Sequence, residues 1–321
     1  MHETVSQNSN PARKTSICTL FEGDYHLGLA ALVNSLVHAG YAGTVWVGYR
    51  GALPPWLEQL KWLDAQGAEY MVADQIRLVF LPVETNIHFT SYKPQFMLDL
   101  FANQASDCGY IWYFDPDIFV RCAWSFFANW QRYGIALCQE IANNILPDNS
   151  PLRYQWMEIA AGMGLGTPRA LNYYLNGGMV GVSAEHTEFL HLWKRFIQVG
   201  QAAGANINQI VSGTREMPFA ILDQDAMNMA AMYTQHPLTT MGPDAMGFVP
   251  AGFAMFHSTG PKPWRGSLLL RALAGTPPSS AFKFFFTQVE SPIRVYSPWR
   301  LRAKRLACKI AAFIGRFYRR G

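Results

Sequence analysis

Short apolar runs alternate with amphipathic segments along most of the chain. Runs with the alternation of strands precede segments in which apolar residues recur every three to four positions. The pattern predicts strands at residues 16–21, 44–49, 77–81, 110–113, 134–138 and 179–182. It predicts helices at residues 28–39, 56–66, 94–105, 187–198 and 218–231. Strands that alternate with helices favour a mostly parallel α/β sheet covered on both faces, with ligands at the carboxyl ends of its strands.

The remaining stretches are less regular. Residues 141–151 form a polar segment rich in Asn and Pro, for which we predict a loop, and residues 242–256 read as loop and strand leading to His257. No linker clearly divides the chain before about residue 290. We therefore expect a disordered N-terminus at residues 1–14, a single domain at 15–290 and a distinct C-terminal segment at 291–321.

Charge is distributed unevenly along the 321 residues. The formal net charge is +4, but residues 299–320 hold eight Lys or Arg and no acid, so the rest of the chain carries −4. Apolar residues recur through this basic segment at helical spacing: Trp299, Ala303, Leu306, Ile310, Phe313 and Phe317. A basic amphipathic helix with aromatic residues suits an anionic membrane surface. The alternative is an ordinary helix docked on the protein's own core. We expect no nucleic acid partner, because no binding module accompanies the charge.

Composition narrows the cellular setting. No stretch has the uninterrupted apolar length of a membrane-spanning helix, and the first 14 residues are polar, unlike a secretory signal. The five cysteines are scattered, without metal-ligand spacing, as expected of reduced thiols. We expect a cytoplasmic protein that associates peripherally with the inner face of the membrane.

Candidate chemistry begins with Asp115-Pro116-Asp117, which follows the apolar run 110–113. Alternate residues of an extended segment project to the same side, so Asp115 and Asp117 can converge. Two close anions repel unless a cation lies between them, and carboxylates are ligands that Mg²⁺ or Mn²⁺ prefers. A simple turn is the alternative, since Asp and Pro both favour turns.

Three further segments carry unusual polar chemistry. Residues 175–179 contain Gly177-Gly178, residues 222–225 hold Asp223-Gln224-Asp225 among apolar neighbours, and residues 256–264 read Phe-His-Ser-Thr-Gly-Pro-Lys-Pro-Trp. Paired glycines allow the backbone to approach a ligand closely. Each segment also has a structural interpretation: a plain turn, a helix cap, and a hydrogen-bonded core histidine with a packed tryptophan.

In this order, the four segments resemble the pattern of glycosyltransferase family 8, from about residue 16 to residue 266. The string from His257 through Gly260 to Lys262-Pro263-Trp264 is its most specific part. The resemblance implies a GT-A-type, Rossmann-like mixed sheet flanked by helices. It also implies a metal-dependent enzyme that transfers a hexose from a UDP-sugar with retention of configuration.

The resemblance also implies the ligands of the metal and of the diphosphate. Asp115, Asp117 and His257 match the metal ligands of the family, with Mn²⁺ or Mg²⁺ as the cofactor. Lys262 matches its phosphate-contacting lysine, and Gly260 would let the backbone approach the phosphates. The metal would neutralise the charge of the leaving diphosphate.

The remaining site residues follow in the same way. Thr19, Tyr25 and Lys93 match positions at the nucleotide, although Glu22 and Asp24 depart from the acid and Asn that family members commonly carry before the tyrosine. The residues implied at the sugar are Asn176, Gly177, Asp223 and Gln224. An amide is a poor nucleophile, unlike the carboxylate of retaining hydrolases, so Gln224 favours front-face attack with an oxocarbenium-like transition state.

The sequence thus predicts a UDP-sugar-dependent hexosyltransferase whose acceptor is a hydroxyl of a glycan, such as a lipopolysaccharide or another lipid-linked glycan. Residues 141–157 are the expected acceptor contact. Three alternatives use the same fold: a sugar-nucleotide hydrolase, a nucleotidyltransferase, and a non-catalytic protein that binds nucleotide or glycan. The nucleotidyltransferase is disfavoured because residues 19–25 hold one glycine and no basic residue.

Overall fold

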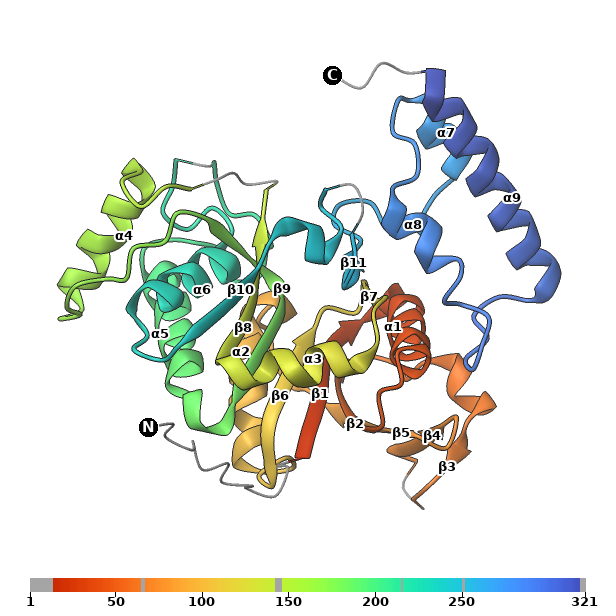
Figure 1. Ribbon diagram of the computed structural model, residues 1–321, viewed down its shortest axis with the longest axis horizontal. Helices are drawn as coiled ribbons and strands as arrows, with labels where there is room; N and C mark the ends of the chain where they lie inside the picture. Colours follow the sequence, from red (N-terminus) through yellow and green to blue (C-terminus); the bar gives the residue numbers. More distant parts are fainter. Residues whose placement is uncertain (1–13, 65–66, 142–145, 215, 250–251, 318–321) are drawn as a thin grey trace, which may run out of the picture.

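The computed structural model describes residues 14–64, 67–141, 146–214, 216–249 and 252–317. Its centre is a sheet in the strand order β10-β8-β9-β6-β1-β2-β5-β4-β3 (Figure 1). These strands are β10 (Leu238–Met241), β8 (Ile135–Glu140), β9 (Tyr174–Ser183), β6 (Cys108–Phe114), β1 (Lys14–Glu22), β2 (Gly43–Arg50), β5 (Ile76–Pro82), β4 (Glu69–Val72) and β3 (Lys61–Trp62). The expected disordered segment lies outside the described residues except for Lys14, which begins β1.

The sheet is mixed. Strands β6, β1, β2 and β5 run parallel to one another, whereas β9 lies antiparallel between β6 and β8. Alternate residues of β6 enter opposite cores: Ile111 and Tyr113 pack on one face, Tyr110 and Trp112 on the other. This arrangement confirms the predicted α/β class with a covered sheet.

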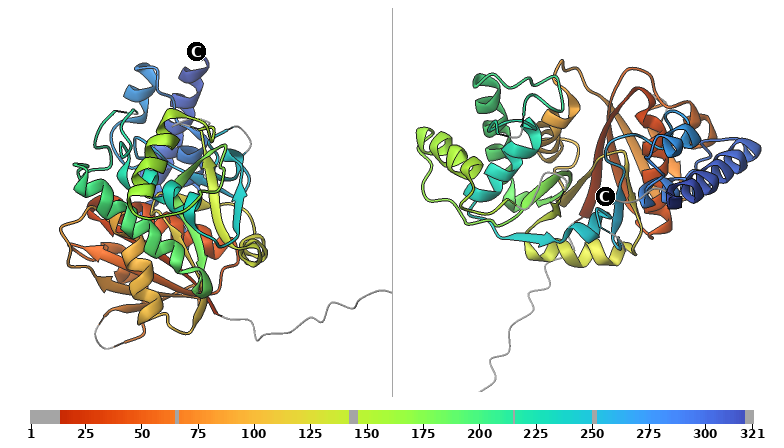
Figure 2. Two further views of the ribbon diagram at one scale, coloured as in Figure 1. Left: turned by 90° about the vertical axis from the view of Figure 1, so that its left-hand side faces the viewer. Right: turned by 90° about the horizontal axis from the view of Figure 1, so that it is seen from above.

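Helices cover both faces of the sheet (Figure 2). Helices α2 (Phe89–Ala102), α5 (Glu188–Ala202) and α6 (Leu222–Tyr233) pack on one face, with α4 (Pro151–Gly162) beyond them. Helices α1 (His26–His38) and α3 (Trp124–Trp130) pack on the other. Short 3₁₀ turns join these elements: η1 (Gly23–Tyr25), η2 (Pro55–Gln59), η3 (Gln131–Tyr133), η4 (Ala184–His186) and η5 (Pro243–Met246).

The predicted strands are confirmed, with ends that shift by a few residues, but the predicted helix at residues 56–66 is wrong. It is only the turn η2, after which the chain straightens into β3. Trp56 and Leu57 are buried, but the residues after Leu57 up to 64 are exposed or half-buried, so a longer helix would gain no packing.

One helix start also differs from the prediction, and one helix was not predicted. Helix α2 begins at Phe89 rather than at residue 94, because the Nδ1 atom of His88 accepts the backbone N–H of Thr90 and caps the first turn. The predicted loop at 141–151 lies partly outside the described residues. The chain then continues as α4, capped by the side chain of Ser150.

A second, two-stranded sheet lies at the carboxyl end of β6. Strand β7 (Ile118–Val120) pairs antiparallel with β11 (Met255–His257), and His257 faces Ile118 in the register. This pairing joins segments far apart in the sequence and places His257 beside Asp117, as predicted for the site.

The C-terminal part of the chain forms α7 (Leu268–Leu273), α8 (Ser280–Phe285), α9 (Pro298–Ile314) and η6 (Gly315–Phe317). Helix α9 packs beside α7 and buries Leu301, Cys308 and Ala311. The apolar stripe predicted from the sequence lies instead on the outside of α9. Within the described residues, no helix has the length and apolar content needed to cross a bilayer.

Asn34 of α1 connects the C-terminal part to the sheet. Its side chain is fully buried, donates to the carbonyl oxygens of Gln288 and Ile293 at 2.8 Å each, and accepts the N–H of Ile293 at 2.9 Å. An apolar side chain at this position would leave three backbone groups without these partners.

We predict that Asn34→Ala lowers the free energy of unfolding by about 2–4 kcal/mol, since each buried polar group left unpaired costs about 1–3 kcal/mol. Chemical denaturation measures this loss, and limited proteolysis should show earlier cleavage after residue 288. Ser35→Ala, which removes a neighbouring hydroxyl bonded within its own helix and to Val120, should leave cleavage after residue 288 unchanged. Equal protection in Asn34→Ala would contradict the anchoring role.

Candidate functional site

The predicted site residues gather in one cavity of about 320 Å³ at the carboxyl ends of β1 and β6. Walls come from α2, β9, α6 and the segment after β11. The predicted residues that line it are Tyr25, Lys93, Asp115, Asp117, Asn176, Gly177, Asp223, Gln224, His257, Gly260 and Lys262. Thr19 is the exception, because its side chain is completely buried within β1 and does not reach the cavity.

Asp115, Asp117 and His257 form a candidate metal site. One ligand atom from each lies within 4.8 Å of the other two. The Nε2 atom of His257 is 3.4 Å from Oδ1 of Asp117 and 3.8 Å from Oδ2 of Asp115. Backbone bonds from Asp115 to Gly178 and from Ser258 to Asp117 hold the three segments together. Two carboxylates and one imidazole are a donor set that fits Mn²⁺ or Mg²⁺.

Lys262 is bonded to one of these carboxylates. Its Nζ atom lies 2.5 Å from Oδ2 of Asp117 and 2.8 Å from the carbonyl oxygen of Ser258. Burial disfavours the charged form of both groups, but attraction between opposite charges outweighs burial. His257 and Lys262 lower the pKa of Asp117, and Asp117 raises the pKa of Lys262. Without a bound ligand, the ammonium therefore neutralises the carboxylate.

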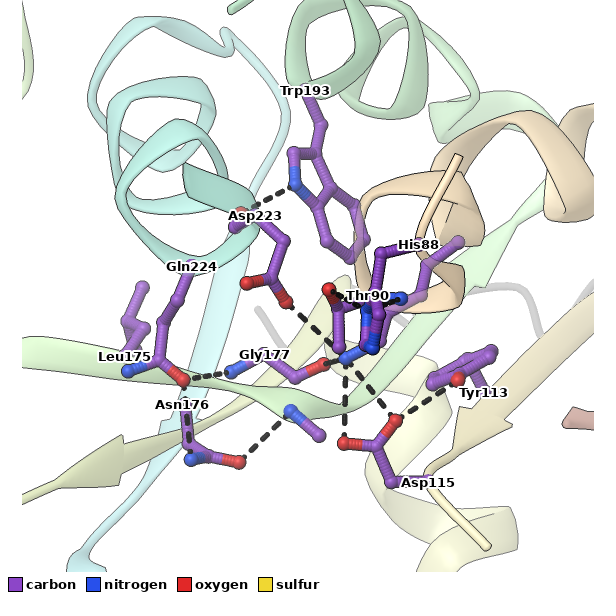
Figure 3. A network of polar contacts seen from close by, with 12 residues as sticks. His88, Thr90, Tyr113, Asp115, Leu175, Asn176, Gly177, Trp193, Asp223 and Gln224 are labelled. Atoms are coloured by element: carbon purple, nitrogen blue, oxygen red, sulfur yellow. Dashed lines mark hydrogen bonds and ion pairs between the residues drawn. The ribbon is translucent and has the colours of Figure 1, made fainter. Parts of the chain in front are cut away.

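Lys93 of α2 neutralises the opposite side of the cavity. Its side chain is 2% exposed, and Nζ lies 2.9 Å from the carbonyl oxygen of Gly177, 3.1 Å from Asp115 and 3.4 Å from Asp223. Figure 3 shows Asp115, Gly177 and Asp223 converging from three elements. Burial lowers the pKa of Lys93, but the two nearby carboxylates raise it by more, so the pKa lies above its ordinary value. Burial raises the pKa of Asp223, which Lys93 partly offsets.

Close packing requires a glycine at position 178 of β9, whereas a Cβ atom at Gly177 would make only an ordinary contact. A Cβ atom on Gly178 would lie 2.5 Å from Cε1 of His257, and one on Gly177 would lie 3.4 Å from Oδ2 of Asp223. Asn228 of α6 fixes this stretch, because its side chain bonds both the N–H and the carbonyl oxygen of Leu175 at 2.9 Å. Helix α6 and β9 are therefore held in one relative position, with Asp223 beside the glycines.

A buried carboxylate that the sequence analysis missed completes the wall. Glu140, at the end of β8, accepts from Nδ2 of Asn176 at 2.8 Å and from Nε2 of Gln224 at 2.6 Å. The Oε1 atom of Gln224 accepts the N–H of Gly177 at 3.0 Å, as Figure 3 shows. An acid at the carboxyl end of a predicted strand was the signal that could have identified Glu140, as it identified Asp115.

The sequence analysis missed His88 and, although it named the cluster that contains Asp225, assigned no role to that residue. His88 lines the cavity, and burial lowers its pKa. Asp225 is buried behind the cavity, where it accepts from the hydroxyl of Tyr174 at 2.6 Å and from the N–H of Ile221 at 2.8 Å. Burial raises the pKa of Asp225 to about 7.

Aromatic and charged side chains surround the predicted nucleotide position. Tyr25 packs edge-on against Trp264, with ring centroids 5.6 Å apart, and the cations of Lys262 and Arg265 lie 5.7 and 5.1 Å from its ring. Arg265 also pairs with Asp24. Glu22 and Arg50 form a similar ion pair at 2.6 Å. Both acids that depart from the family pattern thus have arginine partners.

Comparisons with known proteins place the fold. No protein-family model matches the sequence, and no curated protein matches it significantly. Among solved structures, the chain resembles apo WbbM, a bifunctional glycosyltransferase, with a TM-score of 0.55, 13% identity and 92% of the chain covered. It spans 53% of the WbbM chain. It also resembles an active-site mutant of LgtC, with a TM-score of 0.51, 16% identity, and coverage of 90% of this chain and 99% of LgtC.

These similarities confirm the predicted GT-A-type fold. LgtC is a family 8 glycosyltransferase, so the resemblance based on the four motifs is confirmed at the level of the fold. The candidate metal site at Asp115, Asp117 and His257 is consistent with the divalent metal sites of such folds.

We predict that Lys262→Met tightens Mn²⁺ binding to the nucleotide-free protein several-fold, because Asp117 loses the ammonium that competes with the metal. Titration of Mn²⁺ followed by electron paramagnetic resonance measures the affinity. Arg265→Met, which removes a cation paired with Asp24 instead, is the control and should leave it unchanged. Weaker Mn²⁺ binding in Lys262→Met would show that the lysine does not compete with the metal.

Proposed function

We propose that this protein is a metal-dependent retaining glycosyltransferase that moves a hexose from a UDP-sugar to a hydroxyl acceptor. The observation that carries the proposal is the cavity itself. The fold is of the GT-A type, and one cavity of about 320 Å³ is lined by the three residues of the candidate metal site, by Lys262, which could contact a phosphate, and by the polar cluster of β9 and α6. A metal and a cation beside neutral and acidic hydrogen-bonding groups suit a diphosphate joined to a sugar.

The diphosphate would occupy the metal side of the cavity. Asp115, Asp117 and His257 would hold Mn²⁺ or Mg²⁺, which neutralises the charge on the leaving diphosphate. Lys262 would release Asp117 and contact a phosphate oxygen as a second positive charge. Gly260 lies in the lining with a positive φ of 72°, and the open space around it leaves the backbone accessible to the phosphates.

The sugar would lie between β9 and α6. Asp223 and Asn176 would bind its hydroxyls, and Lys93 holds Asp223 in place through an ion pair at 3.4 Å. Gln224 lies at the same wall, where its amide can stabilise positive charge near the anomeric carbon but is a poor nucleophile. We therefore favour front-face substitution. The bond from the anomeric carbon to the diphosphate oxygen breaks, the acceptor oxygen bonds on the same face, and its proton passes to the leaving phosphate.

Uridine is the proposed nucleoside. Tyr25 is positioned to stack on the base, since one edge of its ring is packed against Trp264 while the residue still lines the cavity. Glu22 lines the cavity at the same end and, held by Arg50, can accept an N–H of the base. The role predicted for Thr19 stays a prediction.

We further propose that the C-terminal helices bind an anionic membrane and that the acceptor is a lipid-linked glycan, such as a lipopolysaccharide. The outer side of α7 and α9 exposes large apolar side chains, which together we name the apolar face. Its members are Leu270 (68% exposed), Leu273 (59%), Trp299 (70%), Leu306 (59%), Ile310 (43%), Phe313 (55%) and Phe317 (75%).

The charge around the apolar face supports a lipid partner. Arg300, Arg302, Lys309 and Arg316 are exposed on α9 and η6, and α9 holds no acid. Docking on the body uses the opposite side of the helix, so the two interpretations of the tail are compatible. Apolar side chains flanked by cations suit a surface of anionic lipids.

In this proposal, residues 15–290 form the transferase domain and residues 291–321 the membrane-associating tail, with α7 adding to its surface. The protein would act in the cytoplasm on the inner face of the membrane. The five free thiols agree with a reducing compartment.

A screen of sugar nucleotides with Mn²⁺ tests the proposed activity. We expect UDP with Mn²⁺ to raise the midpoint of thermal unfolding and one UDP-sugar to be turned over. Asp117→Ala should lower turnover by more than about 100-fold, because a metal ligand is lost. Asp107→Ala is the matched control, since Asp107 precedes the other end of β6 and forms an ion pair with the exposed Lys14 there.

Three outcomes would contradict the proposal. Release of free hexose with every acceptor would favour a hydrolase, and UDP binding without turnover would favour a binding protein. No response to any nucleotide would refute the nucleotide site altogether.

Sedimentation with lipid vesicles tests the membrane proposal. We expect the protein to bind phosphatidylglycerol vesicles and to bind pure phosphatidylcholine at least about tenfold more weakly, because each basic residue near an anionic surface contributes about 1 kcal/mol. Ile310→Ser with Phe313→Ser should abolish binding without loss of turnover on a soluble acceptor. Trp62→Ser on the edge strand β3, 65% exposed and outside the C-terminal helices, is the control. Equal binding by all variants would contradict the assignment.

A further inference from the structure

One carboxylate oxygen of Glu140 accepts hydrogen bonds from two side-chain amides. The Oε2 atom of Glu140 accepts from Nδ2 of Asn176 at 2.8 Å and from Nε2 of Gln224 at 2.6 Å, and Glu140 is only 6% exposed. An oxygen that takes both contacts is the acceptor of both. The NH₂ end of each amide must therefore face Glu140, whichever way the side chains are otherwise free to turn.

This constraint decides the direction of the oxygen of Asn176. With its NH₂ group toward Glu140, Oδ1 points the other way, where it accepts the N–H of Gly178 at 2.9 Å and lies 3.1 Å from Nδ1 of His257. A carbonyl oxygen can only accept. The contact with His257 is a hydrogen bond only if the ring proton resides on Nδ1.

The position of that proton decides what His257 offers on its other side. With the proton on Nδ1, Nε2 carries the lone pair, and Nε2 is the atom that lies 3.4 Å from Asp117 and 3.8 Å from Asp115. A lone pair directed there can bind a metal, whereas an N–H cannot. Hydrogen bonds from a ligating histidine to a second residue commonly fix its tautomer and orientation.

Gln224 is fixed by the same oxygen. Its Nε2 faces Glu140, so Oε1 faces β9 and accepts the N–H of Gly177 at 3.0 Å. The reversed amide would direct two N–H groups at each other. One buried carboxylate thus orients groups on both the metal side and the sugar side of the cavity.

We propose that Glu140 is a positioning residue that orients the amides of Asn176 and Gln224 and, through Asn176, holds His257 in the tautomer with the proton on Nδ1. The group Glu140–Asn176–His257 is named the amide relay. The part that concerns metal affinity rests on the metal site of the proposed function. The tautomer is tested by a measurement that requires no ligand.

Nitrogen-15 NMR of the metal-free protein, labelled at histidine, tests the tautomer directly. Spectra are recorded at increasing pH until the ring signals no longer change, so that the neutral ring is observed. The His257→Gln variant identifies the signals of His257 among those of the eight histidines. We expect the proton on Nδ1. A proton on Nε2 in the unmodified protein would overturn the proposal without any variant.

Two substitutions at Glu140 separate hydrogen-bond direction from charge. Glu140→Met removes the acceptor, and we expect a mixture of His257 tautomers with Mn²⁺ binding about tenfold weaker, the size usual for second residues behind a metal ligand. Glu140→Gln keeps a carbonyl oxygen that can accept from both amides, and it should restore the Nδ1 tautomer and most of the affinity.

Asp225→Asn is the matched control. Asp225 is a second buried carboxylate of the same region, but its bonds go to Tyr174 and Ile221, outside the amide relay. It should leave the tautomer and Mn²⁺ affinity unchanged. Unchanged tautomers in Glu140→Met would overturn the proposal, as would a Glu140→Gln variant as impaired as Glu140→Met. If Glu140→Met does not fold, the tautomers of His257 measured in the unmodified protein and in Glu140→Gln test the proposal.

These results are distinguishable from failure of the proposed function. A protein that turns over no sugar nucleotide but shows the Nδ1 tautomer, lost in Glu140→Met, would retain the amide relay without the transferase. Turnover of a UDP-sugar with His257 in the opposite tautomer would retain the transferase and refute the relay.

Discussion

The structure depends on the neutralisation of carboxylates that meet at one edge of the sheet. Asp115, Asp117 and Asp223 converge there with little exposure to water, and without partners their charges would repel strongly. Lys93 and Lys262 supply positive charge from two different segments. The site is therefore held together by the same charges that a metal and a diphosphate would use, and ligand binding becomes an exchange of partners rather than a new arrangement.

The fold brings these groups together through two strand pairings. Strand β9 lies beside β6, so its glycines meet the aspartates, and the pairing of β7 with β11 brings in His257. The Cβ clearances at Gly177 and Gly178 show how closely these segments approach. Hydrogen bonds then fix direction as well as distance: Glu140 is an acceptor for two amides, and that polarity passes to the imidazole. Hydrogen bonds through Glu140 thus link the candidate metal site to the polar cluster of β9 and α6.

The C-terminal helices follow a different principle. The side chain of Asn34 connects them to α1 by three hydrogen bonds to the backbone of residues 288 and 293, while α9 buries a narrow set of small and medium side chains. Its larger apolar residues remain outside, beside exposed arginines and lysines. Helix α9 is attached by the face that carries its smaller apolar side chains and exposes the face that carries its larger ones. The exposed face is suited to a second apolar partner. A surface site for lipid would place a lipid-linked acceptor near the same molecule that holds the donor.

Sequence alone determined what depends on neighbours along the chain. Strand alternation, the paired Asp115 and Asp117, and the ordered motifs around His257 and Lys262 predicted the α/β class and a set of site residues of which all but Thr19 line the cavity, because each signal is local. Tertiary structure decided what depends on burial and on partners far away. The helix predicted at residues 56–66 is replaced by the turn η2 and by β3, which pairs with β4, and the side chain of Thr19 is buried within β1 and does not reach the cavity. Lys93 was predicted as a nucleotide contact, but its position among two carboxylates, like the orienting position of Glu140, follows from strands and helices that meet only in the folded chain. These tertiary contacts decide which charges neutralise one another and which atom of each amide faces its neighbour.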